Sequence, residues 1–213
     1  MSKPYISSSV IKRLPRYYRF LGDLHLKGVE RISSSDLAQR MGVTASQIRQ
    51  DLNCFGGFGQ QGYGYNIPQL RESIGEILGV KVEKKTVLIG AGNLGRALAT
   101  HMDFKGKGYQ LIGIFDKKPS IIGQIVSGIP IRDISSLDEF CRENKPDVAI
   151  LCIPREETHD IARQLVKLRV KAFWNFTHYD LSIEFPDITV ENVHLGDTLM
   201  TLSYNLTHNE KEK

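Results

Sequence analysis

The 213-residue sequence lacks long apolar runs and paired cysteines. No apolar stretch approaches the ~20 residues that a helix needs to cross a bilayer, so we expect no membrane span. Residues 1–10 contain no apolar core followed by small residues, and we therefore expect no signal peptide. Cys54, Cys141 and Cys152 are an odd number at unrelated spacings. This pattern favours reduced thiols in the cytoplasm over a disulfide framework or a zinc site.

Acidic residues are absent from the first 20 positions, which hold five basic residues. Residues 1–80 contain 10 Lys and Arg against 6 Asp and Glu, a balance of +4, whereas residues 81–213 contain 18 of each. A basic end on an otherwise neutral chain indicates either a module that faces a polyanion or a solvated helix face. The six histidines show no metal-ligand spacing, so we expect no metal site and expect each histidine to be at the surface or packed.

The first half of the chain has the periodicity of short helices. Apolar residues at spacings of three and four predict a helix over about 10–27, and Ser33–Ser35 predict the start of a second helix, 36–41, which ends at Gly42. Thr44 and Gln47 have the spacing of a capping box and predict a third helix to about Phe55. Its polar face carries Ser46, Arg49, Gln50 and Asn53.

Two helices joined by a glycine turn, the second with a polar face, are typical of a helix-turn-helix. Arginine can bind guanine, and asparagine or glutamine can bind adenine, in the major groove. The following residues, 56–65, alternate glycine with tyrosine and predict a tight β-hairpin, the wing of a winged helix. A purely helical subdomain is the alternative, but the basic start and the hairpin together favour DNA binding.

The second half predicts a nucleotide-binding α/β domain. The apolar strand 86–89 enters Gly90-Ala91-Gly92-Asn93-Leu94-Gly95, which matches G-x-G-x-x-G, and a helix follows to about residue 102. Asp116 ends the next strand, 109–115, where an acid would bind the ribose hydroxyls and favour NAD(H) over NADP(H). Further strands at 148–153, 172–176 and 188–190 and helices at 137–143 and 157–168 predict a doubly wound, Rossmann-like sheet. A last helix, about 196–205, carries a leucine stripe that suits either its own domain or a partner.

These motifs, in this order, resemble the Rex family of redox-sensing transcriptional repressors over nearly the whole chain. The resemblance is carried by Arg13-Leu14-Pro15-x-Tyr17, by Gln47-Ile48-Arg49-x-Asp51-Leu52-x-x-Phe55-Gly56, by Phe58-Gly59 and Gly62-x-Gly64-Tyr65, by the glycine turn, and by Asn175-Phe176. It implies a homodimer that binds a palindromic operator, prefers NADH over NAD⁺ as inducer and exchanges its C-terminal helix between subunits. The sequence departs from this family at three positions. Family members often carry a basic residue where Gln50 stands, Tyr where His101 stands and Asp where His194 stands.

We therefore predict a winged-helix DNA-binding domain (1–80), a Rossmann NAD(H) domain (81–190) and a C-terminal dimerisation helix and tail (191–213). The residues predicted to bind DNA are Arg13, Arg16, Tyr17, Ser46, Gln47, Arg49, Gln50, Asn53, Gln61, Gly62 and Tyr63. The residues predicted to bind NADH or NAD⁺ are Gly90, Ala91, Gly92, Asn93, Leu94, Gly95, Arg96 and Asp116, with Phe104 and Phe176 as an apolar wall for the nicotinamide.

Two other functions fit part of this pattern. A small NAD-dependent oxidoreductase with a helical N-terminal extension would need a catalytic domain, and only about 28 residues remain after residue 185. A CoA-binding Rossmann module would share the glycine turn, but Asp116 at the ribose position argues against it. No catalytic residues are therefore predicted.

Overall fold

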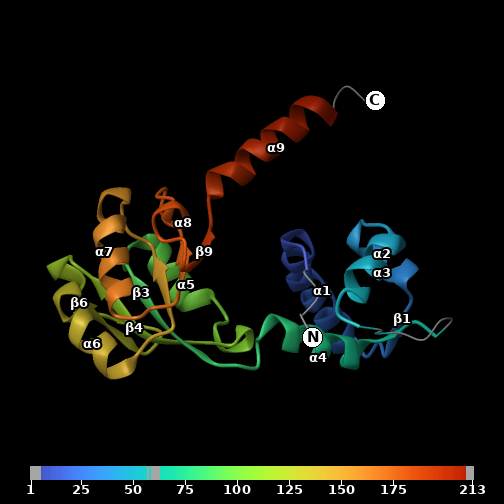
Figure 1. The fold of residues 1–213 in the computed structure, drawn as a ribbon, viewed down its shortest axis with the longest axis horizontal. Helices are drawn as coiled ribbons and strands as arrows, with labels where there is room; N and C mark the ends of the chain where they lie inside the picture. Colours follow the sequence, from blue (N-terminus) through green and yellow to red (C-terminus); the bar gives the residue numbers. More distant parts are fainter. Residues whose placement is uncertain (1–5, 57, 59–62, 210–213) are drawn as a thin grey trace. The chain divides into compact units, whose positions relative to one another are not determined.

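The computed structural model describes residues 6–56, 58 and 63–209, and the chain divides into two compact units, Met1–Lys81 and Val82–Lys213 (Figure 1). The division lies next to the predicted end of the DNA-binding domain. The second unit includes the C-terminal helix, which we predicted as a separate dimerisation segment.

The first unit is built of helices around a small antiparallel sheet. Its elements are α1 (Ser8–Leu26), β1 (Arg31–Ile32), α2 (Ser34–Met41), α3 (Ala45–Asn53), β2 (Tyr65–Asn66) and α4 (Ile67–Leu78). One apolar core joins them, and its fully buried side chains include Leu14, Leu37, Ile48, Leu52 and Ile74. The apolar spacings in the sequence are therefore the ones that face this core.

Helix ends in this unit follow the local signals of the sequence. The Ser33 hydroxyl accepts a hydrogen bond from the Asp36 amide at 3.0 Å, and the Thr44 hydroxyl accepts one from the Gln47 amide at 3.1 Å. Gly42 ends α2 in the left-handed conformation (φ 65°), which glycine adopts without a steric cost. The predicted helix-turn-helix, α2 and α3, is confirmed.

The small sheet of this unit contains a strand pairing that was not predicted. Tyr65 and Asn66 pair antiparallel with Ile32 and Arg31, so the strand after the glycine-rich segment joins the chain before α2. Residues 57 and 59–62 lie outside the described residues, and the predicted hairpin falls largely on them. Helix α4 was not predicted, although Asn66 caps it through a 2.9 Å hydrogen bond from the Gln69 amide and Gly79 ends it.

The second unit is a seven-stranded sheet with helices on both faces (Figure 1). Its strands are β3 (Lys84–Ile89), β4 (Tyr109–Asp116), β5 (Ile125–Val126), β6 (Ile129–Asp133), β7 (Val148–Leu151), β8 (Ala172–Asn175) and β9 (Thr189–Asn192). Its α-helices are α5 (Asn93–His101), α6 (Leu137–Asn144), α7 (Arg155–Lys167), α8 (Leu181–Glu184) and α9 (Leu195–Asn209), and 3₁₀ turns are Lys105–Lys107, Pro119–Ile121 and Ile134–Ser136.

The strand order, β5-β6-β4-β3-β7-β8-β9, places six parallel strands in the Rossmann order with β5 antiparallel at one edge. The predicted fold class is thereby confirmed. Strands β5 and β6 were not predicted, because Ser127, Gly128 and Pro130 break the short apolar segment Ile125–Asp133 into pieces that read as a loop.

The two faces of the sheet are covered differently. One face packs against α6 and α7 through Leu137, Cys141, Ala162 and Leu165. The other packs against α5 through Ala99, and its half-buried residues over β8 include Trp174 and Phe176. Residues 195–208 of α9 are all exposed, so the leucine stripe does not pack on its own domain.

Candidate nucleotide site and DNA-binding surface

The glycine turn connects β3 to α5 at the carboxyl end of the sheet. Gly90 has a φ of 96°, and a Cβ there would lie 2.3 Å from the Cys152 carbonyl oxygen, which follows β7. A Cβ on Gly95 would lie 1.9 Å from the Gly90 carbonyl oxygen. Only glycine fits at these two positions, because backbone on the neighbouring segments occupies the space.

Gly92 has a different environment. A Cβ there would meet nothing within 4 Å, and Gly92, Asn93 and Leu94 are exposed. No side chain caps the N-terminus of α5. A bare backbone next to an uncapped helix N-terminus is the arrangement that binds a pyrophosphate, since the N–H groups and the helix dipole favour an anion. The open side of Gly92 is thus suited to a ligand.

Asp116 lies directly beside this turn. One of its carboxylate oxygens accepts a hydrogen bond from the Ala91 amide at 2.6 Å, and the other accepts one from the Lys118 amide at 2.9 Å. Arg96 braces the turn, because its Nε donates to the Ala91 carbonyl at 2.9 Å and its terminal nitrogen donates to Gln124 at 2.6 Å. The structure therefore brings together the glycine turn, the acid and Arg96.

The two phenylalanines predicted as one nicotinamide wall come from different ends of the strands. Phe176 follows the carboxyl end of β8, and its ring lies edge-on to that of Trp174 with 4.7 Å between centroids. Phe104 precedes β4 and lines a mostly apolar hollow of about 340 Å³ at the opposite, amino end of the strands. Both rings pack against one core cluster, and Trp174 lines the hollow beside Phe104 while its own ring contacts Phe176. The shared wall stays a prediction.

Two histidines stack on each other at the carboxyl end of the sheet, a contact that the sequence alone did not predict. His178 follows β8 and His194 follows β9, and their rings stack with 5.8 Å between centroids and an interplanar angle of 9°. Strands β8 and β9 are adjacent and parallel, so residues that follow them meet at one edge. His101 ends α5 and is exposed.

The half-buried thiol of Cys152, near the glycine turn, is not suited to redox chemistry. Cys152 lies between the glycine turn and the apolar core, and burial raises the pKa of its thiol to about 12. The reactive form of cysteine is the thiolate, which is scarce at such a pKa. Redox sensing by oxidation of Cys152 is therefore disfavoured.

The polar face of α3 forms the candidate DNA-reading surface. Ser46, Arg49, Gln50 and Asn53 are exposed, and Gln47 is half-buried beside them. The Arg49 guanidinium donates a 3.0 Å hydrogen bond to the Ser34 hydroxyl at the start of α2. This contact orients the arginine across the helix-turn-helix while its side chain stays accessible.

The opposite side of α3 carries a buried carboxylate, Asp51, whose role the sequence alone does not predict. Asp51 is 2% exposed and accepts three hydrogen bonds at 2.7 Å, two from Arg13 and one from the Tyr17 hydroxyl. Burial alone would raise the pKa of Asp51, but the hydrogen bonds from Arg13 and Tyr17 hold it below its usual value. These contacts fasten α3 to α1.

This network changes the predicted roles of two residues. Tyr17 is 1% exposed, and burial together with the hydrogen bond to Asp51 raises the pKa of its phenol. A DNA contact by Tyr17 is wrong for this conformation, because the ring is in the core. Arg13 is half-buried, and the contact with Asp51 occupies its Nε and one terminal nitrogen.

The remaining predicted DNA contacts lie on the surface or outside the described residues. Arg16 is exposed and donates to the Met41 carbonyl oxygen at the end of α2. Tyr63 is exposed, and its carbonyl accepts a 3.2 Å hydrogen bond from Arg31. Gln61 and Gly62 lie outside the described residues.

Comparisons with known proteins agree with both units. Residues 5–53 match a family model of a DNA-binding protein N-terminus, and residues 81–179 match the CoA binding domain family. The chain is 48% identical over 208 residues to the redox-sensing transcriptional repressor Rex of Clostridium perfringens strain 13, covering 98% of each chain. It is 50% identical over 201 residues to Rex of Clostridium kluyveri, covering 94% of this chain and 95% of the relative.

Solved structures agree with these matches. The structure of RSP in complex with β-NAD⁺ and operator DNA matches with a TM-score of 0.89 and 48% identity, covering 98% of this chain and 95% of that one. RSP in complex with β-NADH matches with a TM-score of 0.88 and 45% identity, covering 98% and 97%. The relatives are named as repressors, so the oxidoreductase alternative is not favoured and the protein is a regulator rather than an enzyme. The chain belongs to the Rex family of redox-sensing transcriptional repressors.

Proposed function

We propose that this chain represses transcription by binding a palindromic operator as a homodimer, and that NADH binding releases it. In this way it senses the NADH/NAD⁺ ratio of the cytoplasm. The observation that carries the proposal is the near full-length match to RSP, whose structures hold β-NAD⁺ with operator DNA in one case and β-NADH in another. No helix among the described residues is long and apolar enough to span a membrane.

The nucleotide is bound at the glycine turn. The pyrophosphate lies over Gly92 and the N-terminus of α5, where no side chain competes for the space. The adenosine ribose binds Asp116, at the end of the next strand. The nicotinamide then extends past β7 towards Phe176. An apolar ring there disfavours the cationic nicotinamide of NAD⁺, because a desolvated charge is costly.

Operator DNA is bound by the polar face of α3. Base edges in the major groove are read by Ser46, Gln47, Arg49, Gln50 and Asn53. A backbone phosphate is held by Arg16, and the minor groove is reached by the wing residues 61–63. Asp51 and Tyr17 hold this helix in place from behind. Arg13 acts through Asp51 and not chiefly through a phosphate.

The homodimer is formed by α9. Its exposed apolar residues include Leu199, Met200 and Leu202, each 53–66% exposed. Helices normally bury such residues against a partner. The face of the sheet with Trp174 and Phe176 is only half-buried, although parallel sheets have both faces covered. We infer that α9 of a second copy covers this face, so residues 191–213 serve as the dimerisation segment next to the domains 1–80 and 81–190.

The experiment is a measurement of operator affinity at fixed salt with NADH, NAD⁺ and CoA added separately. A palindromic DNA selected from a random pool by the protein itself serves as operator. NADH should weaken binding strongly and NAD⁺ weakly, and operator DNA must weaken NADH binding by the same factor. Equal affinities with NADH and NAD⁺ would contradict redox sensing. Release by CoA alone would favour a CoA-responsive regulator, and turnover of NADH with a substrate would favour the oxidoreductase.

A further inference from the structure

We propose that a basic groove at the C-terminal ends of α6 and α7 binds a compact phosphate-bearing anion such as pyrophosphate or a nucleoside triphosphate. The basic groove is a hollow of about 530 Å³ whose lining includes Arg142, Lys145, Asp147, Lys167, Arg169 and Lys171. Its volume is in the range of small-molecule sites.

The groove is separate from the nucleotide site. It lies where α6 ends before β7 and where α7 ends before β8, which is the amino edge of the parallel sheet. The glycine turn lies at the carboxyl edge, after Ile89. The proposal therefore adds a second site to this domain and does not depend on the proposed function.

Cations dominate the lining of the groove. Five of its residues are Lys or Arg, and its one acid, Asp147, already accepts hydrogen bonds from Lys171 at 3.3 Å and from the Lys85 amide at 3.2 Å. Within the described residues, the side chains of Lys145, Lys167 and Arg169 have no ion pair or hydrogen bond. The two helix ends oppose an anion with about −0.5 charge each, which is less than these three free positive charges.

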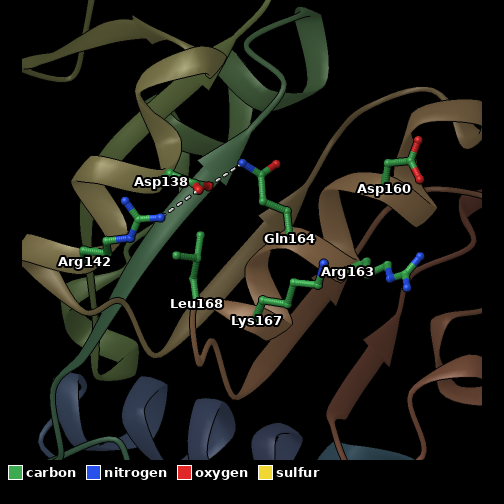
Figure 2. A pocket seen from close by; sticks show the side chains of 7 residues that line it. All are labelled: Asp138, Arg142, Asp160, Arg163, Gln164, Lys167 and Leu168. Carbon is green, nitrogen blue, oxygen red and sulfur yellow. Dashed lines mark hydrogen bonds and ion pairs between the residues drawn. The ribbon is translucent and has the colours of Figure 1, made fainter.

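An adjoining hollow of about 400 Å³ between α6 and α7 shares Arg142, Lys167 and Leu168 with the groove (Figure 2). Figure 2 shows Arg142 and Gln164 directed at Asp138, with hydrogen bonds of 3.2 and 2.5 Å. The negative charge of Asp138 is therefore already offset by Arg142, so Asp138 would repel a bound anion only weakly.

Backbone strain sets this groove apart from an ordinary charged surface. Lys145 has a φ of 50° and Arg169 a φ of 67°, and they are two of three described non-glycine residues with positive φ. Glycine or asparagine is usual at such positions. A cation in the last helical turn would offset the helix dipole without this strain. That both strained residues are basic and line one hollow points to a ligand.

A compact anion fits this arrangement better than a nucleic acid strand does. Five cations near two helix ends line one concave hollow, and a compact anion could contact several of them at once. Phosphates along DNA are several ångströms apart and are contacted in rows. A further cation, Lys85, lies at the amino edge of the sheet, where its Nζ donates a 3.3 Å hydrogen bond to the Asn144 carbonyl.

The test uses the full-length protein saturated with NADH, so that the glycine turn is occupied, and titrates inorganic pyrophosphate and tripolyphosphate by calorimetry at fixed ionic strength. If NADH does not bind, the proposed function fails, and the groove is then tested without it in the Gly92→Val background. The variant is Lys145→Asn/Arg169→Asn, because asparagine tolerates a left-handed backbone while removing the charge. Lys167→Gln is a second variant that leaves both strained turns unchanged. Lys27→Asn/Lys105→Asn is the control, since it removes two exposed charges elsewhere.

One anion should bind per chain, and both groove variants should weaken it about tenfold or more while the control changes it little. Absence of binding by the parent protein would overturn the proposal. So would an equal loss in the control, which would indicate general electrostatics, or no loss in either groove variant. If pyrophosphate does not bind but the groove variants lower the salt dependence of operator binding by about 0.9 per lost contact, the groove contacts DNA and the proposal is wrong.

Discussion

Arg13 on α1 and Asp51 on α3, 38 residues apart, form a two-pronged ion pair in which each nitrogen–oxygen distance is 2.7 Å. The Asp51 side chain is 3% exposed, whereas the Arg13 side chain is 31% exposed. A carboxylate buried to this extent is stable only with its partners in place. The pair therefore ties α3, the proposed DNA-reading helix, to the core of the first unit.

Removing Arg13 should destabilise this unit more than removing a surface arginine. Arg13→Gln leaves Asp51 buried with one hydrogen bond, and breaking such pairs costs about 3–5 kcal/mol, with the lower end expected because Arg13 is partly exposed. Arg19→Gln is the matched control on the same helix. Chemical denaturation measures both, and equal unfolding free energies would contradict the linkage. Arg13→Gln/Asp51→Asn should recover part of the loss.

Substitution of Arg49 should affect the choice of sequence more than the fold. Arg49→Ala removes a base contact, which typically costs about 1–3 kcal/mol and relaxes preference at one position. Binding to the selected operator and to a scrambled duplex measures the ratio. Arg16→Ala should weaken both duplexes alike if Arg16 holds a phosphate. An unchanged ratio for Arg49→Ala would mean that α3 is not the reading helix.

Two glycines of the same turn should behave in opposite ways. Gly92→Val has open space around the Cβ and should keep the fold and operator binding, but its bulk should abolish NADH binding. Gly95→Ala forces a Cβ into the Gly90 carbonyl and should lower the melting temperature even without a nucleotide. NADH fluorescence and thermal unfolding separate the two effects. Unchanged NADH affinity in Gly92→Val would show that the turn is only structural.

Asp116 should decide between NADH and NADPH. Asp116→Ala removes hydrogen bonds of a charged group to the ribose, worth about 1.5–3 kcal/mol each, and also the repulsion of a 2′-phosphate. The ratio of the two dissociation constants should therefore move towards NADPH. Asp133→Ala is the control, since Asp133 ends the neighbouring strand β6 and bonds only locally. If the ratio does not move, another residue binds the ribose.

His159 should add stability that disappears at alkaline pH. Its pKa is raised by a hydrogen bond with Asp160 and by Glu184, whose carboxylate lies 2.7 Å from Nε2. A raised pKa in the folded state means that the contribution is fully present below the ordinary value of about 6.5 and is lost as pH rises through the folded pKa. His159→Gln should therefore lower the melting temperature at pH 6 more than at pH 8.5. His25→Gln is the control, and an NMR titration of His159 with an ordinary pKa would contradict this.

Much of the architecture followed from short stretches of sequence. The helix-turn-helix was predictable, because its signals lie within one or two helical turns of one another. These signals are the cap formed by Thr44 and Gln47, the stop at Gly42 and the apolar spacing of Ile48 and Leu52. The same holds for the strand before Gly90 and for Asp116, because a βαβ unit encodes its own order. Helix α4 was also within reach, since Asn66, Pro68 and Gly79 are ordinary signals of a helix start and stop.

Other features depended on residues far apart in the chain. Tyr17 reads as a DNA contact in sequence, but it lies in the core because Asp51, 34 residues later, accepts its hydroxyl. The strand Tyr65–Asn66 pairs with Arg31–Ile32, which precede α2 in the chain. Phe104 precedes β4, whereas Phe176 follows β8. The sequence by itself determined helix periods, caps and the glycine turn, whose energies are local. Only the tertiary structure decided which side chains are buried, paired or brought together, because those energies depend on packing between distant segments.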